Sequence, residues 1–589
     1  MKFIKEEKII LWILIIVSAY LEVYTFDYVY LESLELIRGG TISTLLFIFF
    51  IVISYTMSEI KDRGVVCWGI VFGILTASVM IVGNKLMMVN NISSIFSSFK
   101  SILLYFLLFC GYFILSTELF SIMFCAIKRN KVYIVKQSNR NMHGKKKWYF
   151  LWLIMAVSYL PCYLSYFPGI MSYDSGWITR QALGILSYDN FQPFLHTIFW
   201  TAFVKFELWT GIDTIGLILY SITQILILTS IFTYVVYRLY EMGFHIIYCV
   251  IAYLFYALSP IMALFSFVVT KDVLFTGIFL LFSLYLLDCS RDISAFFICK
   301  KKMFSFAIIT VCACLFRNNM IYVIIVYAFI FILCCKTVRK QATILFGIVI
   351  LTYYFVVGGV YTVIGVQDGN IREMLSVPIS QLANVYINYD DVLTLEQKEL
   401  INVYIPDVLE YDPQIADDIK AAFASQLFEE NPKEFIFLWW QVLLKKPLVY
   451  VETFLALNLP YWYPEMGSVR TYIETQHVSS YYDVSRTEAL PQINRFYEVF
   501  AMYRLDFIYM PIMQQLFAIS TPIWLLLISV VCFIIKKRYQ YIWVVLPSIL
   551  LWLTYLLGPV SNLRYVLPLM ALYPILVGLM FYKEGVRRN

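Results

Sequence analysis

The chain has 589 residues, of which 61% are hydrophobic and only 14% are charged, and its mean hydropathy is +0.76. A soluble protein of this size could not bury so much apolar surface, and repeated apolar runs of about 20 residues predict membrane spans. The formal net charge of +6 does not indicate a nucleic acid as a partner, because the basic residues form short clusters between the apolar runs. The partner that the composition predicts is the lipid bilayer.

The apolar runs predict an all-α polytopic membrane protein with about 12 to 14 spans. They are expected near 9–25, 40–57, 64–83, 101–127, 148–166, 213–236, 244–260, 271–288, 304–316, 319–335, 341–362, 509–535, 539–557 and 565–583. The first run lacks a small-residue cleavage site and is expected to be a retained signal anchor. The run 304–316 is short enough to be half of a broken helix. A further run, 193–210, is expected to lie on the membrane surface or to re-enter it, because it contains three charged or titratable side chains.

Clusters of Lys and Arg set the expected orientation, because cytoplasmic loops are enriched in basic residues. The clusters lie in 128–147, 300–302, 336–340, 536–538 and 583–588. With fourteen spans and a cytoplasmic N-terminus, all of them fall on the cytoplasmic side, together with the C-terminus. The expectation is a multi-pass protein of a bacterial plasma membrane. The loop 167–212 and the acidic region 363–508 are expected outside the cell.

The same pattern divides the chain into parts. Residues 1–127 are expected to form an N-terminal module of about four spans, 128–147 a basic cytoplasmic loop, 148–362 the core transmembrane region, 363–508 an external and mainly helical region, and 509–589 the last three spans and a basic tail. Within the external region, Lys445-Lys446-Pro447 interrupts an apolar run, which predicts two juxtamembrane helices rather than one span.

The stretch 166–183, YFPGIMSYDSGWITRQAL, places Asp174 just beyond a predicted span. One interpretation is structural: Ser172 or Asp174 caps a helix that begins near Trp177. The other is functional: a carboxylate beside a dry cleft takes a proton from an attacking hydroxyl. Gln192 and His196 follow in the same loop and are candidates for binding a substrate.

Further charged residues lie at the expected external ends of later spans. Lys271 and Asp272 begin a span, and they either extend into the headgroups or bind a substrate. Arg317 occupies a short turn, where it is either unremarkable or part of an anion site. Arg564 and Tyr565 lie between two prolines, and a planar guanidinium suits bidentate phosphate binding.

The order of these motifs resembles a known class. They are F-P-G-x-x-x-x-D-S at 167–175, N-x-Q-P-x-x-H-T at 190–197, S-P at 259–260 before T-K-D at 270–272, R-N-N at 317–319, M-L-S-V-P-I-S-Q-L-A at 374–383 and R-Y-x-x-P at 564–568. Over residues 148–583 the chain resembles the GT-C class of membrane glycosyltransferases, particularly uncharacterised bacterial members. Protein O-mannosyltransferases and lipid A aminoarabinose transferases are more distant relatives of that class.

The resemblance implies a GT-C-like helix bundle that moves a sugar from a polyprenyl-phosphate donor to a glycan, lipid or protein hydroxyl, with inversion. It implies Asp174 as the catalytic base and, less directly, Lys271 and Asp272 as residues that position a substrate. Arg317 and Arg564 would neutralise the departing phosphate. Asp174-Ser175 replaces the paired Asp-Glu of better-known members, which leaves the acceptor contact and a divalent metal open. No other cofactor is expected.

Two other functions remain open at this point. A transporter or flippase of lipid-linked saccharides would carry charges near the middle of its spans and two matching halves with broken helices. A non-catalytic polysaccharide-assembly protein would keep its cellular role when Asp174 is replaced by Asn. The charged candidates at the ends of spans favour the enzyme over the transporter.

Overall fold

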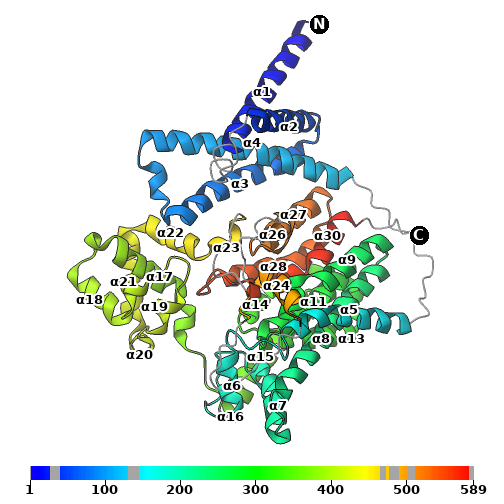
Figure 1. Ribbon diagram of the computed structural model, residues 1–589, viewed down its shortest axis with the longest axis vertical. Coiled ribbons are helices and arrows are strands. Elements are labelled where there is room, and N and C mark those ends of the chain that lie inside the picture. Colours follow the sequence, from blue (N-terminus) through cyan, green and yellow to red (C-terminus); the bar gives the residue numbers. More distant parts are fainter. Residues whose placement is uncertain are drawn as a thin grey trace. The chain divides into compact units, whose positions relative to one another are not determined.

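The computed structural model describes residues 2–26, 40–129, 145–464, 473–475, 490–501 and 511–582 (Figure 1). Over these ranges the chain forms helices, turns and isolated bridges, and no strand. The predicted all-α class is therefore confirmed. Most of the basic loop 128–147, parts of the region 363–508 and the tail 583–589 lie outside the described residues.

Seven helical segments of the described chain are long and apolar enough to cross a membrane. They are α3 (Arg63–Val89), α4 (Phe99–Arg129), α5 (Lys145–Ser165), α8 (Ile215–Glu241), α11 (Lys271–Arg291), the segment Lys336–Ile364 that contains α15 (Arg339–Phe355) and α16 (Thr362–Ile364), and the segment Leu563–Phe581 that contains α29 (Leu563–Ala571) and α30 (Tyr573–Phe581). These helices support a multi-pass membrane protein.

Shorter apolar helices account for most of the other predicted spans. They are found in α1 (Lys2–Phe26), α2 (Gly40–Ser58), α9 (Ile246–Leu258), α14 (Met320–Cys334) and α27 (Thr521–Ile535), and a further short apolar helix, α22 (Pro447–Leu457), lies where a juxtamembrane helix was predicted. The single span predicted at 509–535 is wrong, because α26 (Pro511–Phe517) ends before α27 begins. The run 304–316 is not a short half-helix either: α13 (Lys300–Phe316) has 17 residues, because its first turn is built from the basic cluster.

The chain divides into two compact units. The first contains residues 1–131, 446–459 and 531–538. In it α3 and α4 pack closely through glycines: a Cβ at Gly69 would lie 1.9 Å from the Ser121 hydroxyl. Helix α22 packs against α3, and the Glu452 carboxylate accepts hydrogen bonds from the backbone N–H groups of Ile92 (2.8 Å) and Ser93 (3.0 Å).

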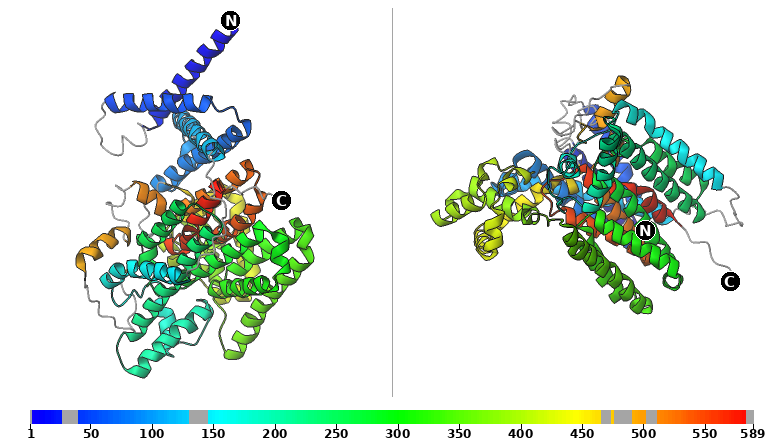
Figure 2. Two further views of the ribbon diagram at one scale, coloured as in Figure 1. Left: turned by 90° about the vertical axis from the view of Figure 1, so that its right-hand side faces the viewer. Right: turned by 90° about the horizontal axis from the view of Figure 1, so that it is seen from below.

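The second unit contains residues 132–445, 460–530 and 539–589. Its most enclosed segments are α11 and Leu563–Phe581, with 78% and 89% of their apolar windows buried, whereas Lys336–Ile364 is only 22% buried. Helix α11 packs against α8, α13, α28 (Ile542–Tyr555) and α29. The bundle can be followed in Figures 1 and 2. The charged side chains in the first turns of α11 and α29 are therefore held by protein rather than by lipid.

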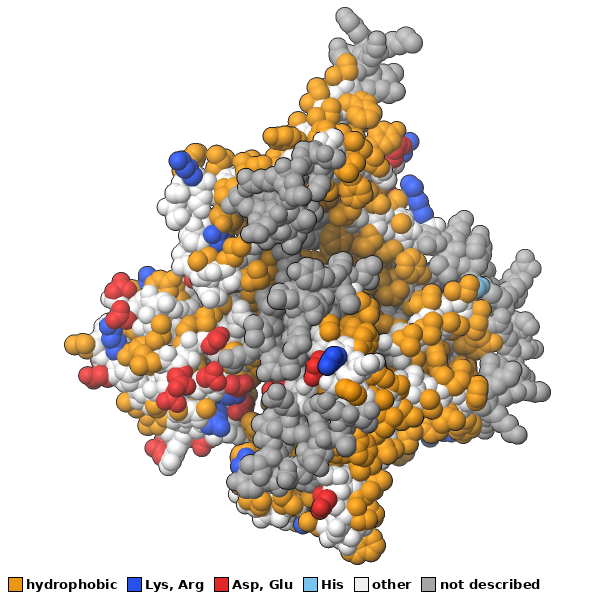
Figure 3. Space-filling view, in the orientation of Figure 1, with side chains coloured by type: hydrophobic (Ala, Val, Ile, Leu, Met, Phe, Trp, Pro, Cys, Tyr) orange, Lys and Arg blue, Asp and Glu red, His pale blue; other side chains and the backbone are white. Residues whose placement is uncertain are grey.

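Shorter helices complete the second unit, except that Leu459, the first residue of one of them, belongs to the first unit. They are α6 (Ser175–Ala182), α7 (Phe194–Thr210), α10 (Pro260–Phe265), α12 (Ile293–Ile298), α17 (Ser376–Asn388), α18 (Leu395–Tyr404), α19 (Asp417–Ala421), α20 (Ser425–Glu430), α21 (Pro432–Lys445), α23 (Leu459–Trp462) and α24 (Pro491–Ala501). The group α17–α21 carries most of the charged side chains visible in Figure 3, and apolar side chains cover the helices to its right.

Two further expectations can be compared with these elements. The break predicted at Lys445-Lys446-Pro447 is present, because α21 ends at Lys445 and α22 begins at Pro447. The run 193–210 forms one helix, α7, whose 17 residues make it shorter than each of the seven long segments. Helix α7 packs against α6 and α8.

Candidate functional site

The loop that carries Asp174 is fixed by the backbone. After α5 ends, Gly169 adopts φ +146°, and a Cβ there would lie 2.5 Å from the Ser221 hydroxyl of α8, so only glycine fits. The next residue, Ile170, donates from its N–H to the Phe267 carbonyl (3.3 Å) and accepts from the Val269 N–H (3.0 Å). These bonds bring the chain before Asp174 beside the chain before Lys271.

Asp174 occupies the N-cap position of α6, but its side chain does not cap the helix. The helix begins at Ser175, two residues before the predicted start at Trp177. The capping role offered for Ser172 is also wrong: its buried hydroxyl has no hydrogen-bond partner in the part of the chain that the structure describes, and the Ser175 N–H donates to the Ser172 carbonyl instead. The Asp174 carboxylate is thus left for other partners.

Tyr173 has a backbone conformation that is uncommon for a non-glycine residue. Its φ is +54°, and its N–H donates to the Glu474 carboxylate at 2.9 Å, while the Glu474 N–H donates to the Tyr173 hydroxyl at 3.0 Å. Tyr173, the neighbour of Asp174, is thus held by two bonds to a segment about 300 positions later in the chain. These bonds stabilise its strained backbone conformation.

Lys271 and Asp272 form the first turn of α11. The Lys271 ammonium donates to the Gln192 side-chain oxygen and lies 3.8 Å from the Asp174 carboxylate. Asp272 is fully buried, and its carboxylate accepts from the Thr270 hydroxyl at 3.3 Å. A carboxylate in the first turn is favoured by the helix dipole. The two adjacent charges therefore point to different partners rather than both into lipid headgroups.

Arg317 follows the last residue of α13 and pairs with Asp272. Its Nε donates to the Asn319 side chain at 3.1 Å. Its guanidinium also lies over the rings of Tyr555 (4.7 Å) and Tyr565 (5.0 Å). Ring faces attract cations, so this arginine is held from several sides.

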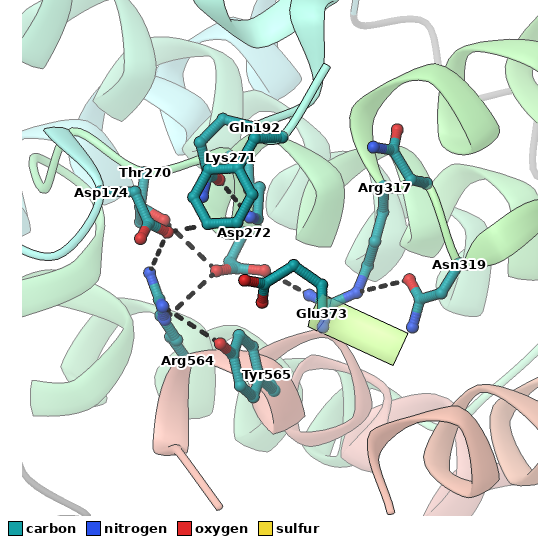
Figure 4. Close-up of polar contacts among 12 residues, drawn as sticks. Asp174, Gln192, Thr270, Lys271, Asp272, Arg317, Asn319, Glu373, Arg564 and Tyr565 are labelled. Atoms are coloured by element: carbon teal, nitrogen blue, oxygen red, sulfur yellow. Dashed lines mark hydrogen bonds and ion pairs between the residues drawn. The ribbon is translucent and has the colours of Figure 1, made fainter. Parts of the chain in front are cut away.

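Arg564, at the start of α29, connects the two carboxylates. Its Nη1 donates to Asp174 at 2.8 Å, its Nη2 to the Tyr565 hydroxyl at 3.1 Å, and its Nε lies 3.8 Å from Asp272. Figure 4 shows the dashed lines from Arg564 to both aspartates. Among the described residues, the buried Nε has no hydrogen-bond partner, and its charge is balanced by the more distant Asp272 carboxylate.

The charged cluster is defined here as Asp174, Lys271, Asp272, Arg317 and Arg564. Sequence analysis singled out all five, and the structure brings them together from four separate segments. The cluster holds three cations and two carboxylates, a formal charge of +1. The side chain of Asp174 is 29% exposed and that of Lys271 is 15% exposed, against at most 9% for the other three. A ligand would therefore reach the cluster at Asp174 and Lys271.

The three remaining candidates have different surroundings. Gln192 holds Lys271, and Tyr565 accepts from Arg564, so both touch the cluster. His196 is buried, and its Nε2 lies 3.0 Å from the Tyr220 hydroxyl, which itself donates to the Gln224 side chain at 2.8 Å. The Gln224 amide donates to the carbonyls before Lys271, so His196 belongs to a bracing network.

Burial and charge set the protonation of the groups outside the spans. Burial alone would raise the pKa of the Asp174 carboxyl, but Arg564 and Lys271 offset it and bring that pKa below its usual value. Burial, with Lys271 nearby, lowers the pKa of His196 to about 3, so this imidazole is neutral at physiological pH. Burial raises the pKa of the Tyr173 phenol, which stays protonated. Asp174 is therefore an anion in the free protein.

A metal centre is not evident among the described residues, where no group of three or more His, Cys, Asp or Glu side chains could hold an ion. Both aspartates of the cluster are engaged by cationic side chains. What the cluster offers chemically is an accessible carboxylate beside several donors for a phosphate or another oxyanion.

Sequence analysis missed several residues that shape the cluster. Tyr173 could have been found from its position directly before Asp174. In the structure, the Arg564 guanidinium lies 4.4 Å from the centre of the Tyr173 ring. Asn319 was quoted only as part of a motif, and its amide also donates to Thr554 at 2.6 Å. Tyr555 and Glu474 carried no signal, because one lies in an apolar run and the other in a long acidic region.

The family model described as "Family of unknown function (DUF6020)" matches residues 187–589, more than half of the chain. The chain belongs to this family. The matched region contains Lys271, Asp272, Arg317 and Arg564, whereas Asp174 lies before it. Neither a curated protein nor a solved structure matches the chain.

Proposed function

We propose that the chain is a membrane glycosyltransferase with a GT-C-like bundle, and that it moves a sugar from a polyprenyl-phosphate donor to an acceptor hydroxyl. The reaction would take place on the external face of a bacterial plasma membrane, where a lipid carrier replaces a nucleotide as the source of activated sugar. The acceptor would be a cell-envelope glycan, a lipid or a protein. Support comes from the residues of the cluster and from the motif order in the sequence.

The observation that carries the proposal is the position of Asp174. It is the most exposed member of the charged cluster, and its carboxylate is free of a capping role. A base must reach the proton it removes, and the exposed part of Asp174 can do so. The buried Arg564 guanidinium behind the carboxylate keeps water away from its protein side. Asp272 cannot take this part, because it is fully buried against Arg317.

The cations suit a phosphate as the leaving group. Lys271 is exposed enough to contact a ligand, and the Nη1 of Arg564 already binds the partly exposed Asp174 carboxylate, which places this guanidinium beside the same opening. Arginine and lysine donors form short, charge-assisted bonds to phosphate oxygens. The formal charge of the cluster is +1 before a ligand enters, so a phosphate would be attracted rather than repelled.

The proposed step is a single displacement. The acceptor oxygen attacks the anomeric carbon, a new C–O bond forms, and the bond from that carbon to the phosphate oxygen breaks. The electron pair leaves on the phosphate, where Lys271 and Arg564 stabilise it, and the acceptor proton passes to Asp174. Attack from the side opposite the phosphate inverts the anomeric carbon.

The low pKa of free Asp174 must be reconciled with its role, because a good general base has a pKa near the working pH. A bound phosphate would compete for the guanidinium and ammonium groups that now hold the carboxylate. With these groups shared, the pKa of Asp174 would rise in the donor complex. The donor would thus activate the base that attacks it.

The test is Asp174→Asn in cells and in the purified chain, with the exposed Asp213→Asn as the matched control. We expect release of polyprenyl phosphate from synthetic polyprenyl-phosphate hexoses to fall about 10²- to 10⁴-fold, with the glycan product lost in cells. The control should behave as wild type. Unchanged product at equal protein level would overturn the assignment of Asp174.

The same test separates the rivals. A non-catalytic assembly protein would tolerate Asp174→Asn. A flippase would move a labelled lipid-linked sugar across vesicle membranes without cleaving it, and its transport would be the activity that the variant changes. Transfer of the sugar to an acceptor with release of the lipid phosphate is expected only of the enzyme.

A further inference from the structure

Two buried glutamates lie in the first unit and belong to no site described above. Glu22 is on α1 and Glu118 is on α4, and their exposed fractions are 0% and 7%. Glu118 is 11 residues before Arg129, the last residue of α4, which corresponds to about 16 Å along the helix. Ionisable residues inside apolar helices are costly, and those that are kept usually have a function.

Their surroundings are apolar. Ala19, Val23, Phe50 and Ile53 form a buried cluster between α1 and α2, and Leu115 and Ile122 of α4 pack against it. The polar neighbour is Ser54 of α2, whose hydroxyl donates to the Glu118 carboxyl at 3.0 Å. Neither oxygen of Glu22 receives a hydrogen bond from an N–H or O–H group of the described residues.

The titratable groups that face each other here are the two glutamates themselves. Helices α1 and α4 each supply one, and among the described side chains α2 supplies the Ser54 hydroxyl. Among the described residues, no Lys, Arg or His forms an ion pair with either carboxyl. Two negative charges side by side in apolar surroundings repel each other and are poorly solvated, so at most one of the two carboxyls can be ionised.

We propose that Glu22 and Glu118 form a proton-binding site in which the two carboxyls share one proton at neutral pH. The proton on Glu22 would donate to Glu118, whose other hydrogen bond comes from Ser54. This arrangement gives the unbonded oxygens of Glu22 a partner. The pair would titrate as one unit with two macroscopic steps. This inference does not depend on the proposed transferase function.

A proton suits the pair better than a metal ion. Calcium takes about 6 to 8 oxygen ligands and magnesium about 6, whereas two carboxyls and one hydroxyl supply fewer. No group of three or more acidic, His or Cys side chains in the described chain could hold a metal. Sodium carries a single charge and is the remaining cation that the experiment must separate from a proton.

The test uses dicyclohexylcarbodiimide, which modifies protonated carboxyls in apolar surroundings, on the full chain in lipid vesicles. Peptide mass spectrometry then locates the product. At about pH 7 we expect labelling of Glu22 or Glu118, falling about tenfold per pH unit above the upper step of the pair. The double variant Glu22→Gln/Glu118→Gln should lose this labelling. Glu452→Gln is the matched control, because Glu452 is also buried but accepts two backbone hydrogen bonds.

Each single variant reports whether the carboxyls are coupled. With one neutral amide in the pair, the remaining carboxyl loses its negative neighbour and gains an N–H donor. The pH midpoint of its labelling should therefore move down. A midpoint identical to wild type would overturn the shared proton.

Three other results would also overturn the proposal. They are absence of labelling at about pH 6, labelling that survives in the double variant, and protection by sodium at constant pH, which would indicate a cation site. Thermal unfolding gives an independent measurement. Glutamine resembles the protonated acid, so the double variant should unfold at the wild-type temperature or above. Clear destabilisation would show that the carboxylates have a stabilising partner.

Discussion

The charged cluster and the carboxyl pair place the same functional group in two opposite environments. In both, two carboxyls lie beside apolar helices. Asp174 and Asp272 meet Lys271, Arg317 and Arg564, whereas Glu22 and Glu118 meet a serine and each other. Asp174 stays ionised among the cations, whereas the two glutamates share a proton. Burial alone therefore does not decide the charge of an acidic residue; the neighbours do.

The difference also bears on function. A carboxylate surrounded by cations is held in place, and a ligand that takes over those cations changes its basicity. A carboxyl pair without cations instead responds to the proton concentration. The following substitutions test this contrast, from the largest expected effect to the smallest.

Arg317→Met should have the largest effect on folding. It removes the direct cationic partner of the fully buried Asp272 and leaves this carboxylate with the Thr270 hydroxyl and the more distant Arg564. We expect the free energy of unfolding to fall by about 3 kcal/mol. Chemical unfolding in detergent measures this, with the exposed Arg291→Met as control. The double variant Arg317→Met/Asp272→Leu should recover most of the loss. Equal stability of Arg317→Met and the control Arg291→Met would contradict the argument.

Replacing a carboxyl by an amide should have opposite consequences in the two environments. Asp272→Asn loses a charge-assisted interaction with Arg317 and should lower the free energy of unfolding by about 2 kcal/mol. Glu118→Gln removes the need for a proton and should leave it unchanged or raise it. Both are measured by unfolding at neutral pH. Destabilisation of similar size in both variants would remove the distinction between the two pairs.

The pH dependence of transfer should show the coupling between donor and base. Asp174 must be ionised to accept a proton, and its pKa is lowered in the free protein. The acid limb of kcat/KM should therefore lie below the ordinary aspartate value of about 3.9. If bound phosphate takes over Arg564 and Lys271, the acid limb of kcat lies at higher pH. Coincident limbs in the two profiles would argue against phosphate at these cations.

His196 should contribute a small effect on stability at acidic pH. Its folded-state pKa of about 3 lies below the ordinary value of about 6.5, so the unfolded chain binds a proton first as the pH falls. The stability from this group is present above pH 6.5 and declines below it by at most about 1.4 kcal/mol per pH unit. His196→Gln should flatten the unfolding temperature between about pH 6.5 and 5. An unchanged slope would contradict the lowered pKa.

The hydropathy of the sequence predicted the helical class and most helix positions, because a bilayer and a buried helix both require long apolar runs. It failed at breaks that depend on local backbone geometry, such as the residues between α26 and α27. The interpretation of Ser172 as a helix cap, based on its residue type and position, also failed. Capping depends on the direction of the side chain, which residue type does not set.

By itself, then, the sequence determined which residues are chemically able to act: Asp174, Lys271, Asp272, Arg317 and Arg564 lie at or just beyond the ends of apolar runs, where charge is costly. Only the tertiary structure decided which of them meet. Four segments far apart in the chain bring the cations to the aspartates, while α1 and α4 bring Glu22 to Glu118 without one. Electrostatic interactions depend on distances of a few ångströms between side chains, and spacing along a sequence does not contain those distances.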